Sequence, residues 1–185
     1  MLDNYIKIPN LEVEPYCSYF LNKFILNNAS QKIEQQTINY FKNTSIKDPI
    51  ICKLENELRT KYKFYYPIDY TILFYHTADQ AIHLDGTRVE TLCSLNLPLI
   101  GNDNIEFIFY EPLEYYDLDI KNARYVKNKD LNILEKIPHK KEWILLNPNI
   151  PHQVIGAKKY DPRVTLCVRF IGNPTFANCK KYFTI

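Results

Sequence analysis

Apolar residues recur at three- to four-residue spacing along residues 14–28, which is the pattern of an amphipathic helix. Pro15 suits the first turn of that helix, because proline lacks an N–H that the first turn would leave unpaired. The same spacing returns within residues 48–62, where Pro49 stands near the start. The pattern therefore predicts two helices in the N-terminal third, whose apolar faces contain Tyr16, Tyr19, Phe20 and Phe24 in the first and Ile51, Leu54 and Leu58 in the second.

The pattern changes to that of β-strands after the second helix. Residues 62–75 are rich in aromatic and β-branched side chains, which predicts several strands. Residues 88–100 predict another strand, and the turn residues at 101–104 predict a hairpin whose returning strand is residues 105–110. Shorter strands are expected at residues 143–146 and 164–171.

Three segments have weaker patterns. Residues 5–13 alternate loosely and contain Pro9, which favours a short edge strand. Residues 27–44 are polar and receive no assignment. Residues 111–141 carry many charges of both signs, which indicates surface strands and loops with a solvated face rather than a nucleic-acid patch.

A helical start followed by eight or more short antiparallel strands predicts an α+β fold that is mainly β, with a sandwich or barrel and helices packed on one face. The 185 residues suit one domain, and no repeat, low-complexity tract or linker divides them. We expect a mainly helical support region at 1–62, a β-rich core at 63–171 and a C-terminal tail at 172–185.

Composition limits the partners. The 23 Lys and Arg residues nearly balance the 21 Asp and Glu residues, which argues against nucleic acid and against an anionic membrane surface. No apolar run approaches the roughly 20 residues of a membrane span, and residues 1–10 lack the apolar run of a signal peptide. The five cysteines include no Cys-x-x-Cys pair and are typical of reduced thiols, so we expect a cytoplasmic protein.

One short stretch carries candidate metal chemistry. His83 and Asp85 stand two residues apart in a strand-like context, so both side chains point to the same face and can bind one metal ion. His152 offers a third ligand much later in the chain. Two histidines and one carboxylate are the ligand set of non-haem Fe(II) oxygenases.

Beyond these three residues, the chain continues with Arg163-Val164-Thr165. The order His-x-Asp, distal His and then Arg-x-Thr resembles the Fe(II)/2-oxoglutarate-dependent oxygenase family. The resemblance covers roughly residues 70–170, and softer matches lie at Tyr75, at residues 95–99, at residues 104–107 and at residues 146–147.

The resemblance implies a double-stranded β-helix, or jelly-roll, core at residues 63–171 with N-terminal support helices. It also implies Fe(II) as the metal, 2-oxoglutarate and O2 as cosubstrates, and hydroxylation of a small molecule or a peptide side chain with release of succinate and CO2. His83, Asp85 and His152 would be both the metal ligands and the catalytic residues.

A bound 2-oxoglutarate needs a cation at its far carboxylate, and the planar fork of arginine serves this better than lysine. Arg163 and Thr165 are the expected anchors, and Arg169, which shares their strand parity, is the competing candidate. Tyr75 and Asn96 are further candidates for binding the cosubstrate, although each also suits a packed core position. His76 and His139 receive no site.

Two alternatives stay open from the sequence. The same core can host a cupin-type metal enzyme of other chemistry, or it can be a non-catalytic jelly-roll binding or structural module that retains the metal residues. The Arg163-x-Thr165 pair discriminates among them, because neither alternative requires a dicarboxylate anchor.

Overall fold

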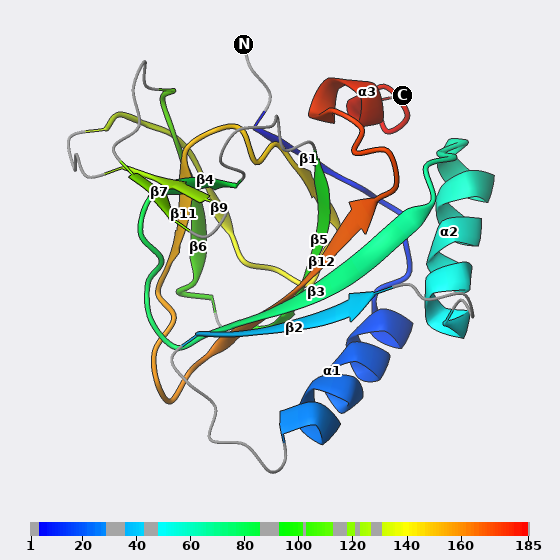
Figure 1. Ribbon diagram of the computed structural model, residues 1–185, viewed down its shortest axis with the longest axis horizontal. Coiled ribbons are helices and arrows are strands. Elements are labelled where there is room, and N and C mark those ends of the chain that lie inside the picture. Colours follow the sequence, from blue (N-terminus) through cyan, green and yellow to red (C-terminus); the bar gives the residue numbers. More distant parts are fainter. Residues whose placement is uncertain are drawn as a thin grey trace.

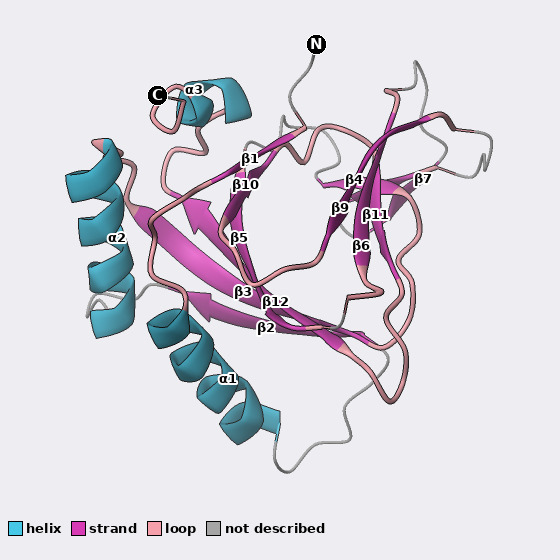
Figure 2. Cartoon of the chain, turned by 180° about the vertical axis from the view of Figure 1, so that it is seen from behind, coloured by secondary structure: helices cyan, strands magenta, loops and turns pink. Residues whose placement is uncertain are grey.

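The computed structural model describes residues 4–28, 36–42, 48–85, 93–101, 103–112, 118–120, 123–126 and 131–184. They form two six-stranded antiparallel sheets, with helices on the outer side of one of them (Figure 1; Figure 2). The expected fold class, mainly β with a jelly-roll core and supporting helices, is confirmed.

The first sheet lies beside the helices. Its strands, in spatial order, are β1 (Tyr5–Lys7), β10 (Ile144–Leu146), β5 (Ser94–Ile100), β12 (Arg163–Phe170), β3 (Ile68–His76) and β2 (Gln36–Lys42). The strand expected within residues 5–13 is therefore present as the short edge strand β1. Residues 1–62, expected as a mainly helical support region, also supply both edge strands of this sheet.

The second sheet contains, in spatial order, β7 (Leu118–Ile120), β8 (Ala123–Tyr125), β4 (His83–Asp85), β11 (His152–Ile155), β6 (Glu106–Tyr110) and β9 (Ile133–Pro138). Its central strands β4 and β11 face the inner side of the first sheet. The two strands come from distant parts of the sequence and meet through antiparallel pairing.

Both predicted helices form where the pattern places them, as α1 (Glu14–Asn28) and α2 (Pro49–Tyr62). Asp48 caps the second helix by accepting a hydrogen bond from the backbone N–H of Ile50 at 3.1 Å. The buried carboxylate of Glu57 then ties the helices together, accepting from the Tyr16 hydroxyl at 2.7 Å and from the Glu12 backbone N–H at 3.2 Å.

Alternation along the first sheet divides it into two chemically different faces. On β5, Leu95, Leu97 and Leu99 pack into the large core beneath the helices. The intervening residues Ser94 and Asn96 line a pocket between the sheets. Because both faces of β5 are covered, residues 94–99 are all buried. The polar side chains of β5 lie on the inner face.

The expected hairpin between residues 88–100 and 105–110 is wrong. β5 pairs with β10 and β12, whereas β6 pairs with β11 and β9. The chain passes from the first sheet to the second between β5 and β6, so the turn residues do not join two neighbouring strands. Residues 86–92 lie outside the described part, and with them the first residues of the strand expected at 88–100.

The several strands expected at 62–75 are reduced to one, β3. Lys63 adopts a left-handed conformation (φ 57°) that ends α2, and its N–H donates to the Arg59 carbonyl. The aromatic residue that follows, Phe64, is buried in the helix-side core rather than paired in a sheet. Aromatic density was therefore a signal of burial here, and not of strand pairing.

Three elements were not expected, namely β2 within the unassigned stretch, β11 at His152 and α3 (Phe176–Lys180) in the tail. Of the charged stretch at 111–141, the segments 113–117, 121–122 and 127–130 lie outside the described residues. No helix of the described residues is long and apolar enough to cross a membrane.

Candidate metal centre

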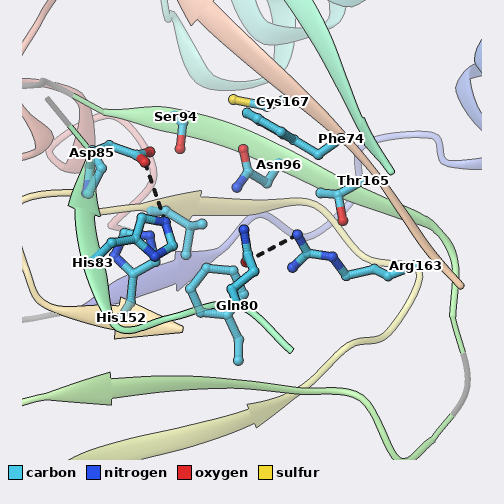
Figure 3. Close-up of a pocket in the computed structure, with 13 residues that line it drawn as sticks. Phe74, Gln80, His83, Asp85, Ser94, Asn96, His152, Arg163, Thr165 and Cys167 are labelled. Atoms are coloured by element: carbon cyan, nitrogen blue, oxygen red, sulfur yellow. Dashed lines mark hydrogen bonds and ion pairs between the residues drawn. The ribbon is translucent and has the colours of Figure 1, made fainter. Parts of the chain in front are cut away.

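The side chains of His83, Asp85 and His152 converge between the two sheets (Figure 3). His83 on β4 pairs in register with His152 on β11, and Asp85 shares a strand face with His83 because it stands two residues further on. One ligand atom from each of the three lies within 4.8 Å of the other two. The sequence prediction that these residues meet is therefore correct.

Both imidazoles are oriented by the backbone in the same way. The Nδ1 atom of His83 lies 2.8 Å from the carbonyl oxygen of Ala81, and that of His152 lies 2.8 Å from the carbonyl oxygen of Ile150. A carbonyl only accepts, so each Nδ1 carries the proton and each Nε2 carries the lone pair. This is how metal-binding histidines are commonly held in the correct tautomer.

The carboxylate of Asp85 has two different sides. Its Oδ1 lies 3.7 Å from His83 Nε2, while its Oδ2 accepts a hydrogen bond from Arg169 Nη2 at 3.0 Å. Burial raises the pKa of Asp85, but Arg169 and the two histidines outweigh that effect and lower it. Asp85 is thus an anion whose one oxygen faces the histidines and whose other is held by Arg169.

The imidazole of His152 is also prepared for metal binding. It is buried and stacks on Phe107, with ring centroids 5.3 Å apart. Burial and the neighbouring His83 lower its pKa to about 4. It is therefore neutral at pH 7, which is the form that can donate its lone pair to a metal ion.

A second polar group lies on the same inner face. Arg163 is only 4% exposed, and its Nη2 donates to His76 Nδ1 at 2.8 Å and to Gln80 Oε1 at 3.2 Å. Its Nε is buried without a hydrogen-bond partner. Burial lowers the pKa of Arg163 to about 9, so the guanidinium keeps its charge at pH 7.

Thr165 stands beside Arg163, two residues along β12 and on the same strand face. Its Oγ1 lies 3.0 Å from His139 Nε2. Arg163, Thr165 and the three candidate metal ligands all line one pocket between the sheets, together with Phe74, Gln80 and Asn96 (Figure 3). The structure thus joins the two halves of the sequence pattern in one cavity.

The remaining candidates separate by strand face. Asn96 lines the pocket, and its Oδ1 is buried without a partner. Tyr75 lies on the opposite face of β3, stacks on Phe24 of α1 at 5.4 Å and packs against the helix-side core. The structure places Tyr75 in the core position that the sequence left open, away from the pocket. Arg169, the competing anchor, is engaged by Asp85.

Several polar residues of the pocket region were not predicted from the sequence, among them Ser94, His76, Gln80 and His139. His76 pairs in register with Arg163 across β3 and β12, so strand parity with Phe74 would have found it once the inner face of β3 was known. Gln80 precedes the His83 stretch directly and reaches Arg163. His139 gave no local signal, because it reaches Thr165 from a loop that follows β9.

No protein-family model and no curated protein matches the sequence. Solved structures do match the fold, at low sequence identity. The chain is similar to the epimerase SnoN in complex with Fe3+, alpha ketoglutarate and nogalamycin RO, with 10% identity, a TM-score of 0.61, and coverage of 90% of this chain and 78% of SnoN.

Two further matches have comparable coverage. HygX from Streptomyces hygroscopicus, with nickel and 2-oxoglutarate bound, shows 10% identity, a TM-score of 0.54, and coverage of 89% of this chain and 81% of HygX. A prolyl-4-hydroxylase from Pseudomonas putida shows 12% identity, a TM-score of 0.52, and coverage of 90% and 91%. The chain therefore has the fold of these non-haem enzymes, and it carries a His-Asp-His cluster.

Proposed function

We propose that this protein is an Fe(II)- and 2-oxoglutarate-dependent oxygenase that oxidises a small molecule or a peptide side chain. The observation that carries the proposal is the presence, in one pocket, of the His83, Asp85 and His152 cluster and of the buried Arg163 with Thr165. A set of three metal ligands alone would suit many enzymes. The buried cation Arg163 in the same pocket favours a dicarboxylate that binds the metal ion through its other end.

The residues present fit iron. Two imidazoles and one carboxylate match the donor set that suits Fe(II), and both imidazoles have their Nδ1 atoms occupied by backbone carbonyls. Arg169 holds Oδ2 of Asp85, so Oδ1 is the oxygen directed toward the histidines. Three ligands on one side leave further positions for a cosubstrate and O2.

The residues around Arg163 fit a carboxylate, because donors there outnumber acceptors. Arg163 Nη2 donates to His76 Nδ1, so the His76 proton must sit on Nε2. That Nε2 faces the side-chain nitrogen of Gln80 at 3.1 Å, while the Gln80 oxygen accepts from Arg163. Two donors, His76 Nε2–H and the Gln80 amide N–H, therefore face each other. If the Gln80 amide were flipped, its N–H would instead face the Arg163 guanidinium, which is also a donor. With Arg163 Nε also unpaired, an incoming anion would supply the missing acceptors.

In the proposed reaction, iron bound at this site would activate O2, of which one oxygen atom enters succinate as 2-oxoglutarate loses CO2 and the other is left to oxidise the substrate. The protein's share is binding and orientation. Arg163 and Thr165 would fix the far carboxylate, and Asn96, which lines the same pocket, would donate to the bound cosubstrate through its amide N–H. Phe107 and Leu146 line the apolar part of the pocket and exclude water beside His152.

The type of oxidation is a separate part of the proposal. Hydroxylation is our expectation, and the fold neighbours include an epimerase, a carbocyclase and a prolyl-4-hydroxylase, so this architecture supports several outcomes. For the location we propose the cytoplasm, which is supported by cysteines that are all free thiols.

Succinate formation in air tests the proposal. Purified protein supplied with Fe(II), ascorbate and 2-oxoglutarate should release succinate slowly even without a primary substrate, and His152→Ala should release none. Tyr75→Phe is the matched control, since Tyr75 lies on the core face, and it should match the wild-type rate. Equal succinate from wild type and His152→Ala would contradict the proposal.

A further inference from the structure

His139 makes an unusual approach to the candidate anchor. It lies in the loop between β9 and β10, where its backbone N–H donates to the Ile105 carbonyl at 2.9 Å. Its ring reaches the inner face of the first sheet and places Nε2 3.0 Å from Thr165 Oγ1. The other ring nitrogen, Nδ1, is buried without a hydrogen-bond partner.

The backbone makes room for this imidazole. A Cβ atom at Gly101 would lie 2.6 Å from His139 Nδ1, closer than real side chains approach. Gly101 has no left-handed conformation to explain its presence, since Gly156 and Gly172 are the glycines with positive φ among the described residues. Glycine at 101 therefore serves the close approach of the His139 ring.

Proton counting distinguishes two arrangements of the pair. If Thr165 donates its hydroxyl proton to His139 Nε2, the ring proton must sit on Nδ1, where it is a buried donor without an acceptor. If Nε2 carries the proton and donates to Thr165 Oγ1, only a bare lone pair is left at Nδ1. Orphaned buried N–H groups are rarer than unpaired acceptors, so the second arrangement is favoured.

The second arrangement has a consequence for Thr165. Its oxygen accepts from His139, so its own hydroxyl proton is available to another acceptor. Arg163 lies on the same face of β12, next to Thr165 in the pocket (Figure 3). A carboxylate held by Arg163 is the acceptor that this hydroxyl would meet.

We propose that His139 is a positioning residue, which fixes the Thr165 hydroxyl as a hydrogen-bond donor toward the anion bound at Arg163. This inference rests on the proposed function, because it takes that anion to be the far carboxylate of 2-oxoglutarate. Burial and the charge of Arg163 lower the pKa of His139 to about 3, so the ring is neutral at pH 7 and carries a single proton.

The tautomer of His139 can be observed directly in the full-length protein. Ring 15N chemical shifts of labelled protein at pH 7, assigned through a His139→Gln variant, should show a protonated Nε2 and a bare Nδ1. The opposite tautomer would mean that Thr165 donates to His139, which would overturn the inference without bearing on iron or 2-oxoglutarate.

Affinity for 2-oxoglutarate, measured anaerobically with Fe(II) bound, supplies the functional test. Two amide substitutions form a matched pair: His139→Gln can place an N–H near the position of Nε2, whereas His139→Asn is too short. We expect the affinity of His139→Gln for 2-oxoglutarate to stay within about twofold of wild type and that of His139→Asn to fall about fivefold. Loss of a whole charge-assisted hydrogen bond lowers affinity about 10- to 100-fold, and His139→Asn only misorients the Thr165 donor. Metal affinity without 2-oxoglutarate should be unchanged in both.

A double-mutant cycle shows whether His139 acts through Thr165. In a Thr165→Val background, which lacks the hydroxyl, His139→Asn should cause no further loss of affinity. In a Thr165→Ser background, which keeps the hydroxyl, it should still weaken binding about fivefold. Equal losses in the wild-type and Thr165→Val backgrounds would overturn the inference.

Failure of the inference is distinguishable from failure of the proposed function. If the wild-type protein forms no complex with Fe(II) and 2-oxoglutarate, the proposed function and the inference fall together. If it forms the complex but His139→Asn binds 2-oxoglutarate as tightly as wild type, the inference alone is wrong.

Discussion

Arg163 and Arg169 stand on the same face of β12 in opposite electrostatic situations, so the same substitution should change stability in opposite directions. Among the described residues, no carboxylate lies within salt-bridge distance of Arg163, and burial lowers its pKa from 12.5 to about 9. Arg169 donates to Asp85 at 3.0 Å, and although burial alone would lower the pKa of Arg169, Cys167 and Asp85 raise it overall. We predict that Arg163→Met stabilises the ligand-free protein and that Arg169→Met destabilises it.

The magnitude follows from the shift at Arg163. At about 1.4 kcal/mol per pH unit, the lowered pKa corresponds to roughly 5 kcal/mol of unfavourable free energy for the charged group at pH 7. Methionine removes that cost but also the two hydrogen bonds to His76 and Gln80, which contribute about 0.5–1.5 kcal/mol each. The net gain expected for Arg163→Met is about 2–4 kcal/mol.

Arg169→Met removes a charged hydrogen bond and leaves Asp85 without its cation. Because the Asp85 side chain is 33% exposed, solvent moderates the effect, and we expect a loss of about 1–3 kcal/mol. Urea unfolding at pH 7, with metal chelated and no 2-oxoglutarate, measures both variants against wild type. A loss of stability in Arg163→Met similar to that in Arg169→Met would show that the charge of Arg163 is already compensated, and would refute the reasoning.

Three further predictions concern the same network and the helices. Burial lowers the pKa of His76 to about 3, while the unfolded chain titrates near 6.5. The unfolded state therefore binds an extra proton as pH falls through this range. The stability present above pH 6.5 should drop by about 1.4 kcal/mol per pH unit, and urea unfolding at pH 7 and 5 should show a smaller drop in His76→Gln than in wild type. Gly101→Ala should displace the His139 ring and weaken anaerobic 2-oxoglutarate binding, with unchanged metal affinity; wild-type binding would contradict this. Glu57→Gln should destabilise the protein by about 1–2 kcal/mol at pH 7. Burial raises the pKa of Glu57, but the hydrogen bonds from Tyr16 and Lys61 lower it overall. The stabilisation by the Glu57 carboxylate is therefore lost as pH falls below about 4.5. If Glu57→Gln lost as much stability at pH 4 as at pH 7, this prediction would be wrong.

Local signals in the sequence were sufficient for the helices. Three- to four-residue spacing placed α1, and the Asp48-Pro49 start of α2 coincides with its capping residue. Such signals are carried by contacts within a few residues. Sheet pairing is not local, which is why β5 and β6 were predicted to form a hairpin although they lie in different sheets.

The candidate site likewise contains residues that local signals predicted and residues that depend on contacts between distant parts of the chain. His83 and Asp85 could be paired by strand parity alone, whereas His152 and Arg163 were predicted because their order in the chain resembles the pattern of a known oxygenase family. The choice between Arg163 and Arg169 could not be made by parity, because both lie on one face of β12, and it depends on the contact of Arg169 with Asp85. The contact of His139 with Thr165 could not be predicted from the sequence, since it depends on a loop that passes close to Gly101.

An anaerobic titration tests the central claim most directly. Adding 2-oxoglutarate to the protein with Fe(II) bound should produce a visible metal-to-ligand absorption band that saturates at one equivalent. The band should require high 2-oxoglutarate in Arg163→Met, survive in Arg169→Met, and be absent in His83→Ala. No band in the wild-type protein, with iron bound stoichiometrically, would contradict the account.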